Sequence, residues 1–391
     1  FMLGYFNNEF GELPMGFVRL LFLMAFASTS FDTGANQTRQ EPNVGATSIE
    51  TAINRRSVSE GCAMDTDSRH TQLESGKHTV NYQAIERSFH LSVPASANIN
   101  APSPMVLIFH GWGGDGNEFL QSDLVIREAN RRGYILVAPT GLGSGAPDHS
   151  LNSWSFKGSM SGLDGDGGKG LTGSICDYQV TKDYNYASCS EVAENSCSWT
   201  QCQQSDVGFA LALAEYVGEK LCVDKNNIFA TGGSNGGMFT WELGQNSASA
   251  PAFRAIAPII GLPHRGYSSS QGKNTSLPVL LITGTEDATV PPGEWGVDGY
   301  TTTSDGDAFF YESATAITKA WASAHACNID SAAMVFDTDY PAADCRTFCG
   351  SDSHWPEVLD CRADMAHTYE LEWVWPLVMD FFDHHSAPSI R

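Results

Sequence analysis

The sequence predicts an α/β fold, built on a mostly parallel central sheet with helices on both faces. Two features of the sequence support this prediction. Short apolar runs alternate with longer segments of helical periodicity, which is typical of strands joined by crossover helices. In addition, the chain has 391 residues and is 42% hydrophobic, which is enough to bury one large core.

Five short apolar runs are predicted to be the buried strands. Each is hydrophobic without alternation, as expected for strands of a parallel sheet that is covered on both faces. The runs lie at residues 105–109, 134–138, 227–231, 253–260 and 279–283.

Helical segments lie between these runs and after the last of them. The segment at 207–221 has a strong amphipathic pattern, with apolar residues recurring at helical spacing. The other predicted helices lie at 117–131, from 235 onward, at 308–325 and at 371–383.

The first 80 residues are interpreted as a leader rather than as part of the fold. Residues 1–27 hold an apolar run that ends in AFA, the pattern of a secretory signal peptide. Residues 28–80 are polar and without period, so we expect a flexible leader before a folded domain at 81–388. Residues 141–205 are rich in glycine, serine and cysteine and predict a disulfide-stapled loop insertion over the site.

Charge and cysteine content limit the class of protein. With 22 Lys and Arg against 45 Asp and Glu, the net charge is −23, which argues against nucleic acid or an anionic membrane as a partner. The ten cysteines, an even number behind a signal peptide, predict disulfides and secretion. We expect a monomer.

Two metal sites are weighed and set aside. Cys345, Cys349, His354 and Cys361 have spacings that a zinc site can use, but export favours disulfides. The segment at 164–168 resembles a calcium loop only faintly and lacks the distal glutamate. We therefore expect no metal and no cofactor.

The segment GGSNG at 232–236 predicts a nucleophilic serine. It matches the G-x-S-x-G pattern, in which glycines leave room for a sharp turn from a strand into a helix. A predicted strand precedes the segment and a predicted helix follows it, which is the context that the motif requires. We therefore predict that Ser234 is the nucleophile.

A serine nucleophile needs a base, and the base needs an orienting carboxylate. Asp287 is the preferred carboxylate because it follows the last predicted strand, with Glu286 and then Asp298 as alternatives. Five histidines follow Asp287, as the order serine, acid, histidine requires. His325 lies inside a predicted helix and His384 and His385 end the chain on the closing helix, which leaves His367 and His354 as candidate bases. His367 is preferred because it precedes the closing helix.

Backbone N–H groups are predicted to stabilise the oxyanion that forms when the serine attacks a carbonyl carbon. One belongs to Asn235, and the other to the loop HGWGG at 110–114, with Trp112 the first choice and Gly113 the second. Aromatic residues on nearby loops are candidates for stacking on a sugar or an aromatic acyl group. They are Trp154, Phe156 and Trp295.

Taken together, these motifs resemble the secreted feruloyl esterase, acetylxylan esterase and polyhydroxybutyrate depolymerase-like family of α/β-hydrolases. The matching segments lie at 110–114, 134–139, 153–154, 206–209, 233–237 and 320–322 leading to Cys327. The resemblance implies an α/β-hydrolase fold without metal and a triad of Ser234, Asp287 and His367. The chain departs from the family at Ala366, where a glycine is typical, and at 369–370, where Trp-Pro is typical.

The predicted function is therefore that of a secreted serine esterase, which cleaves feruloyl, acetyl or related esters of a polysaccharide, or a polyester. One alternative is a serine peptidase, since GGSNGG at 232–237 also resembles the prolyl oligopeptidase family. The residues before the domain are too few for the propeller of those enzymes. The other alternative is a non-catalytic binding protein on the same fold.

Overall fold

A computed structural model describes residues 57–63, 73–98, 101–143, 151–156, 159, 205–265, 277–303, 309–349 and 355–388. Several sequence predictions lie outside the described residues: the signal peptide, much of the leader and of the 141–205 insertion, the segment at 164–168 and His354. No helix in the described part is both long and apolar enough to cross a membrane.

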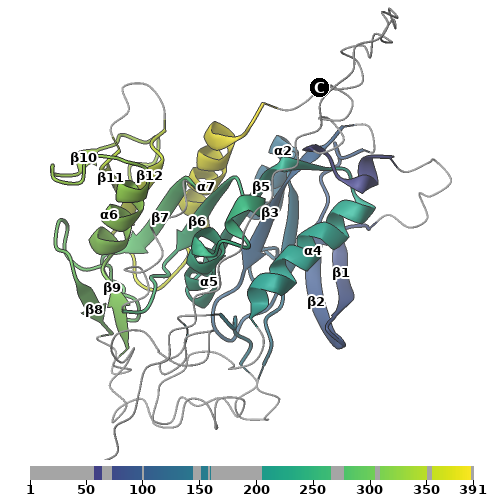
Figure 1. Ribbon diagram of the computed structural model, residues 1–391, viewed down its shortest axis with the longest axis horizontal. Helices are drawn as coiled ribbons and strands as arrows, with labels where there is room; N and C mark the ends of the chain where they lie inside the picture. Colours follow the sequence, from purple (N-terminus) through teal and green to yellow (C-terminus); the bar gives the residue numbers. More distant parts are fainter. Residues whose placement is uncertain are drawn as a thin grey trace, which may run out of the picture. The chain divides into compact units, whose positions relative to one another are not determined.

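In the described part of the chain, a ten-stranded sheet runs through the centre of the fold in the order β1-β2-β4-β3-β5-β6-β7-β12-β11-β10 (Figure 1). Strands β4, β3, β5, β6, β7 and β12 are parallel neighbours, and the strands outside them pair antiparallel. The strands are β1 (Gly76–Tyr82), β2 (Ile85–Ser92), β3 (Ser103–Phe109), β4 (Ile135–Pro139), β5 (Val223–Gly233), β6 (Ala255–Ile259), β7 (Val279–Gly284), β10 (Met334–Val335), β11 (Ala343–Thr347) and β12 (Val358–Ala363). Strands β8 (Tyr300–Thr302) and β9 (Phe310–Glu312) form a separate hairpin.

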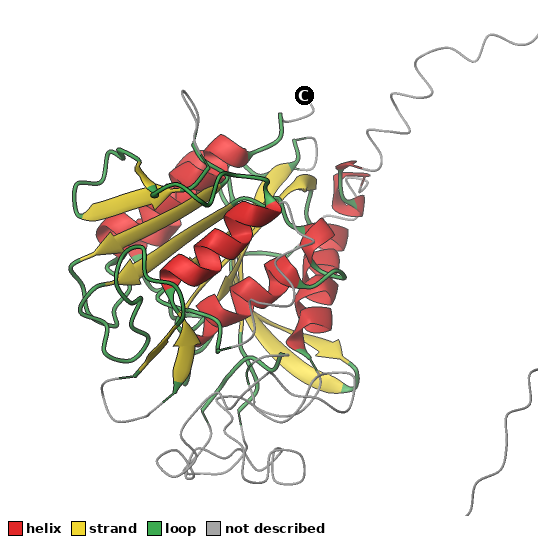
Figure 2. Ribbon diagram, turned by 60° about the vertical axis from the view of Figure 1, so that its left-hand side comes forward, coloured by secondary structure: helices red, strands yellow, loops and turns green. Residues whose placement is uncertain are grey.

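Helices cover both faces of this sheet (Figure 2). Among the described residues, the α-helices are α2 (Asp123–Arg132), α4 (Asp206–Lys220), α5 (Asn235–Gln245), α6 (Ala314–Ala324) and α7 (Leu371–His385), and two short 3-10 helices are η1 (Glu60–Ala63) and η4 (Ala250–Ala252). Side chains of α4, α5 and α6 share one buried cluster with the sheet, and those of α2 and α7 share another. The predicted α/β-hydrolase fold, with helices on both faces, is confirmed.

The parallel strands form because both of their faces are buried. In β3, Met105, Leu107 and Phe109 belong to one cluster, whereas Val106 and Ile108 belong to the other. This alternation follows from the two-residue period of a strand. All five predicted apolar runs are strands of the parallel part, namely β3, β4, β5, β6 and β7.

Two of the predicted helices begin later than expected. Helix α2 begins at Asp123 rather than at 117, because the chain first forms turns around Asp115. Helix α6 begins at Ala314 rather than at 308, since β9 precedes it and the Ser313 side chain accepts a hydrogen bond from Ala316 N–H. Such a side-chain cap satisfies a donor that the helix itself leaves unpaired.

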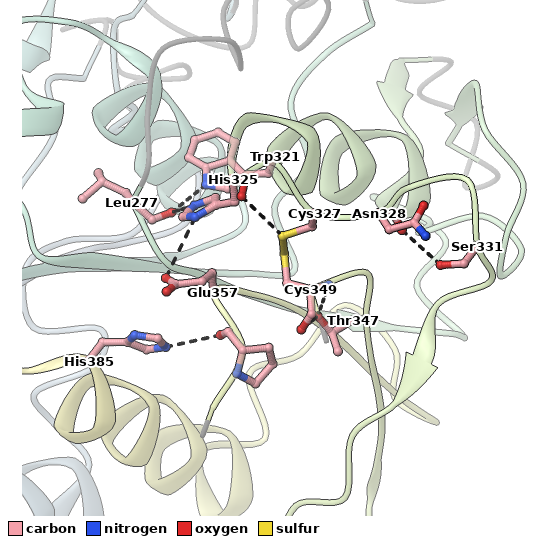
Figure 3. Close-up of a disulfide and its surroundings, with 11 residues drawn as sticks. Leu277, Trp321, His325, Cys327, Asn328, Ser331, Thr347, Cys349, Glu357 and His385 are labelled. Carbon is pink, nitrogen blue, oxygen red and sulfur yellow. Dashed lines mark hydrogen bonds and ion pairs between the residues drawn. A yellow bond between two sulfur atoms is a disulfide. The ribbon is translucent and has the colours of Figure 1, made fainter. Parts of the chain in front are cut away.

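Three disulfides join pairs of described segments. Cys345–Cys361 links β11 to β12, and Cys327–Cys349 links the chain after α6 to the chain after β11 (Figure 3). Since Cys345, Cys349 and Cys361 are all disulfide-bonded, the alternative zinc site is excluded. The third disulfide, Cys62–Cys222, fixes part of the predicted leader to the start of β5.

Candidate active site

The nucleophile turn lies where β5 passes into α5. Ser234 is the single residue between them and has φ 52° and ψ −119°. A positive φ costs a non-glycine residue on the order of 1–3 kcal/mol, so the surroundings must hold it there. Its N–H donates to Ile259 O at 2.9 Å. At Gly236 a Cβ would lie 2.1 Å from Phe109 O, so the turn has room only for glycine.

The structure brings the three predicted triad residues together. Asp287 follows β7 and His367 follows β12, and these parallel strands are neighbours, so both loops leave the same edge of the sheet. His367 Nδ1 lies 2.7 Å from Asp287 Oδ2, and His367 Nε2 lies 2.9 Å from Ser234 Oγ.

Hydrogen bonds to the carboxylate decide which nitrogen of His367 carries a proton. Asp287 Oδ1 accepts the N–H groups of Thr289 at 2.9 Å and Val290 at 2.8 Å, and the side chain is 0% exposed. Oδ2 is left to accept from His367 Nδ1–H. Nε2 is then the acceptor and can receive the proton of Ser234 Oγ, which is the arrangement of a general base.

The alternative carboxylates lie elsewhere. The Glu286 side chain is exposed, and Asp298, which is 58% exposed, pairs with Lys319 at 2.9 Å. Neither has a hydrogen bond to His367 like that of Asp287.

The predicted oxyanion donors are not equally placed. Asn235 begins α5, so its N–H has no partner four residues back in the helix and lies at the positive end of the helix dipole. Gly113 N–H donates to Asn152 O at 2.8 Å. Because this hydrogen is already bonded, the prediction of Gly113 as the alternative oxyanion donor is corrected. Trp112, which is 38% exposed, lies on the same loop.

His110 fixes the start of the oxyanion loop. Its Nε2 accepts from Gly141 N–H at 2.9 Å, so its Nδ1–H donates to Gly111 O at 2.6 Å. Burial lowers the pKa of the His110 imidazole from 6.5 to about 4. His110 is therefore a neutral residue that holds the loop in place rather than a base.

This pKa predicts an acid-sensitive contribution to stability. Below pH 6.5 the unfolded chain protonates His110, whereas the folded protein does so only near pH 4, so stability is lost as the pH falls between these values. Between about pH 7 and 4.5, the stability advantage of the wild type over His110→Gln should shrink by on the order of 2 kcal/mol. Urea unfolding of both proteins over this range measures it. Parallel pH profiles would contradict it.

Two of the three predicted substrate-stacking residues are core residues. Trp154 is 0% exposed, stacks on Phe239 with centroids 5.4 Å apart and donates its Nε1–H to His110 O at 2.9 Å. Phe156 is 3% exposed and also packs against Phe239. The prediction for both is corrected, because neither ring has an open face for a sugar or an acyl group.

The ring of Trp295, the third predicted stacking residue, is in contact with two arginine side chains. The guanidinium of Arg362 lies 3.6 Å from the ring centroid and that of Arg346 lies 4.2 Å from it. Trp295 lines a cavity of about 340 Å³, together with Lys319 and Phe348 among others. None of the triad residues lines this cavity.

Sequence reasoning missed two polar residues of the site, Glu118 and Tyr369. Tyr369 Oη donates to Glu118 Oε1 at 3.0 Å, and Gly111 N–H donates to Glu118 Oε2 at 2.7 Å. The one available signal was the position of Tyr369, two residues after His367.

Feruloyl esterases are among the known proteins that are similar in sequence to this chain. Feruloyl esterase C of Emericella nidulans is 29% identical over 170 residues, covering 42% of this chain and 58% of that protein. A probable feruloyl esterase C of Aspergillus niger is 28% identical over 224 residues, covering 56% of this chain and 60% of that protein. The match thus spans about three fifths of the length of these relatives. The predicted resemblance to feruloyl esterases is confirmed.

Other comparisons are weaker. No family model matches the chain. A solved acetyl xylan esterase from Aspergillus awamori is 14% identical, covers 79% of this chain and 99% of its own, and has a TM-score of 0.44.

Proposed function

We propose that this protein is a serine carboxylic-ester hydrolase. The observation that carries the proposal is the continuous pair of hydrogen bonds from Asp287 through His367 to Ser234, at 2.7 and 2.9 Å. The similarity to feruloyl esterases supports the reaction class. An intact relay beside a strained, glycine-flanked serine is what activates a hydroxyl as a nucleophile.

The reaction proceeds in two halves. Ser234 Oγ attacks the ester carbonyl carbon while His367 Nε2 takes its proton, and the tetrahedral intermediate collapses to an acyl-enzyme. The leaving alcohol receives that proton from His367. Water then attacks the acyl-enzyme, with His367 again as base, and the acid is released as Ser234 regains its proton.

The carbonyl oxygen carries negative charge in both tetrahedral intermediates. In this proposal it lies at the N-terminus of α5, where Asn235 N–H and the helix dipole stabilise it, and Trp112 N–H supplies the second hydrogen bond. Donors held in place before the reaction lower the barrier because they need no reorganisation as the charge develops.

The names of the relatives and the charge of the chain support one class of substrate. We propose feruloyl or acetyl esters on a neutral polysaccharide, with a polyester as the other candidate, because the net charge of −23 disfavours anionic polymers. We also propose that the protein acts outside the cell, as a monomer. The disulfides support this location, since such bonds persist in oxidising compartments.

A panel of substrates tests the proposal. The wild type should hydrolyse p-nitrophenyl acetate and at least one of methyl ferulate, acetylated xylan and 3-hydroxybutyrate oligomers, and a fluorophosphonate probe should label it. Ser234→Ala should abolish both labelling and turnover, because the variant lacks the attacking oxygen.

The same panel discriminates the alternatives. Cleavage of peptide arylamides without ester turnover would favour a peptidase. A folded wild-type protein that resists the probe and cleaves no ester would be a non-catalytic binding protein. Ester turnover that survives in Ser234→Ala would remove Ser234 from the mechanism.

A further inference from the structure

One carboxylate joins two loops of the active site. Glu118 Oε2 accepts from Gly111 N–H at 2.7 Å, and Glu118 Oε1 accepts from Tyr369 Oη–H at 3.0 Å. Gly111 immediately precedes Trp112 on the oxyanion loop, and Tyr369 lies two residues after His367. The carboxylate therefore binds the oxyanion loop (residues 110–114) with one oxygen and the histidine loop (residues 364–370) with the other.

The oxyanion loop is folded around this carboxylate. Gly114 N–H donates to Gly111 O at 3.1 Å, which closes a turn over Glu118. A Cβ at Gly114 would lie 2.6 Å from Glu118 Oε2, so a side chain at this position would displace the carboxylate. Trp112 lies within this turn, directly after Gly111, whose N–H is bound to Glu118.

The ring of Tyr369 also contacts the nucleophile turn. A Cβ at Gly233, the residue before Ser234, would lie 2.1 Å from Tyr369 Cε1, and the ring stacks on Phe119 with centroids 4.8 Å apart. Tyr369 thus lies against the histidine loop, the nucleophile turn and, through Glu118, the oxyanion loop.

The protonation states suit this arrangement. Burial is the main cause that raises the pKa of Tyr369 well above 10, with the nearby Glu118 adding to it, so the phenol keeps the proton that it donates. Burial also raises the pKa of Glu118, while the bonds from Gly111 and Tyr369 oppose that rise by stabilising the carboxylate.

We propose that Glu118 and Tyr369 are positioning residues, which fix the Trp112 N–H and the His367 imidazole relative to one another around Ser234. This inference rests on the proposed ester hydrolysis. Neither side chain needs to touch the substrate, because each acts through a loop that carries a reacting group. The Tyr369–Glu118 bond therefore contributes indirectly to stabilisation of the transition state, because the spacing of the oxyanion donor and the base matters most there.

Two conservative variants test the inference. Tyr369→Phe keeps the ring and removes the hydroxyl, and Glu118→Gln keeps the shape and loses the charge. Each should lower kcat for p-nitrophenyl acetate by about 10- to 100-fold, since a displacement of about 1 Å can cost this much. KM should stay within about two-fold, as expected when transition-state interactions alone are lost. The rate of fluorophosphonate labelling should fall with kcat.

The double variant measures whether the two residues act as a unit. Tyr369→Phe combined with Glu118→Gln should lose little more activity than the worse single variant, because residues in direct contact are not additive. If the fold loss in kcat of the double variant equals the product of the two single losses, the two residues act independently and the shared role is overturned.

Matched controls separate positioning from general stability. Tyr340→Phe removes another tyrosine–carboxylate bond, to Asp380 at 2.6 Å, and Glu128→Gln neutralises a carboxylate that pairs with Arg131 on the surface of α2. Both should lower the melting temperature at most, with kcat unchanged.

Each outcome has a distinct meaning. The positioning role alone would be overturned if the wild type is active and the Tyr369→Phe and Glu118→Gln variants keep its full kcat. The same holds if these variants lose no more kcat than equally destabilised controls do. A folded wild type without ester turnover would instead reject the proposed function.

Discussion

His367→Ala is expected to lower kcat for p-nitrophenyl acetate by about 10⁶-fold, the loss typical when a serine hydrolase loses its base. His367 Nε2 lies 2.9 Å from Ser234 Oγ and receives its proton, and alanine offers no replacement. KM should change little, because the imidazole acts mainly on the transition state. Initial rates measure the loss, with Ser234→Ala as the background. Circular dichroism should show that the variant is folded.

His354→Ala is the matched control, because His354 is the alternative base that the sequence offers. It should retain the kcat of the wild type within about two-fold, as a residue outside the relay does. Loss of activity in His354→Ala together with retention in His367→Ala would transfer the role of base to His354.

The parallel part of the sheet was predictable because its strands are buried on both faces. Such strands are uniformly apolar, and β3, β4, β5, β6 and β7 all were recognised on this basis. Strand β12 is just as buried but was missed, since its sequence, VLDCRA, contains Asp360 and Arg362. The two side chains form an ion pair at 2.8 Å, in which Asp360 is 6% exposed and Arg362 is 1% exposed. A buried ion pair therefore concealed a core strand.

The triad was predictable because its positions follow from the order of the strands. Ser234 and Asp287 come directly after apolar strands, at the edge where a parallel sheet presents its ligand site. His367 was assigned from the closing helix instead, since β12 was not recognised. The structure gives the physical reason for its position, because β12 is the parallel neighbour of β7.

The surroundings of the triad depend on packing, which local sequence does not reveal. Trp154 and Phe156 lie on a loop in the sequence, yet their rings fill the space against Phe239. Glu118 and Tyr369 are 251 positions apart, so no local pattern connects them. An aromatic ring on a loop and an acidic residue before a helix each have several possible surroundings, and only the folded chain selects one.

Asp287→Asn is expected to lower kcat by about 10⁴-fold, as in other triads that lose this charge. The asparagine oxygen can keep the two bonds from Thr289 N–H and Val290 N–H that Asp287 Oδ1 accepts, which turns its NH₂ toward His367. His367 Nδ1 must then accept, so Nε2 carries the proton and cannot take that of Ser234. Because the loop bonds remain, the melting temperature should change little. Initial rates and thermal unfolding measure the two effects.

Glu286→Gln makes the same chemical change one residue earlier, on an exposed side chain, and is the control for Asp287→Asn. It should retain kcat within about two-fold, because an exposed charge is screened by water and does not orient the imidazole. If Glu286→Gln lost about 10⁴-fold while Asp287→Asn stayed active, the orienting carboxylate would be Glu286. Equal, small losses in both variants would mean that the tautomer of His367 is set by another group. The loss confined to Asp287→Asn is the result that the 2.7 Å bond between Asp287 and His367 predicts.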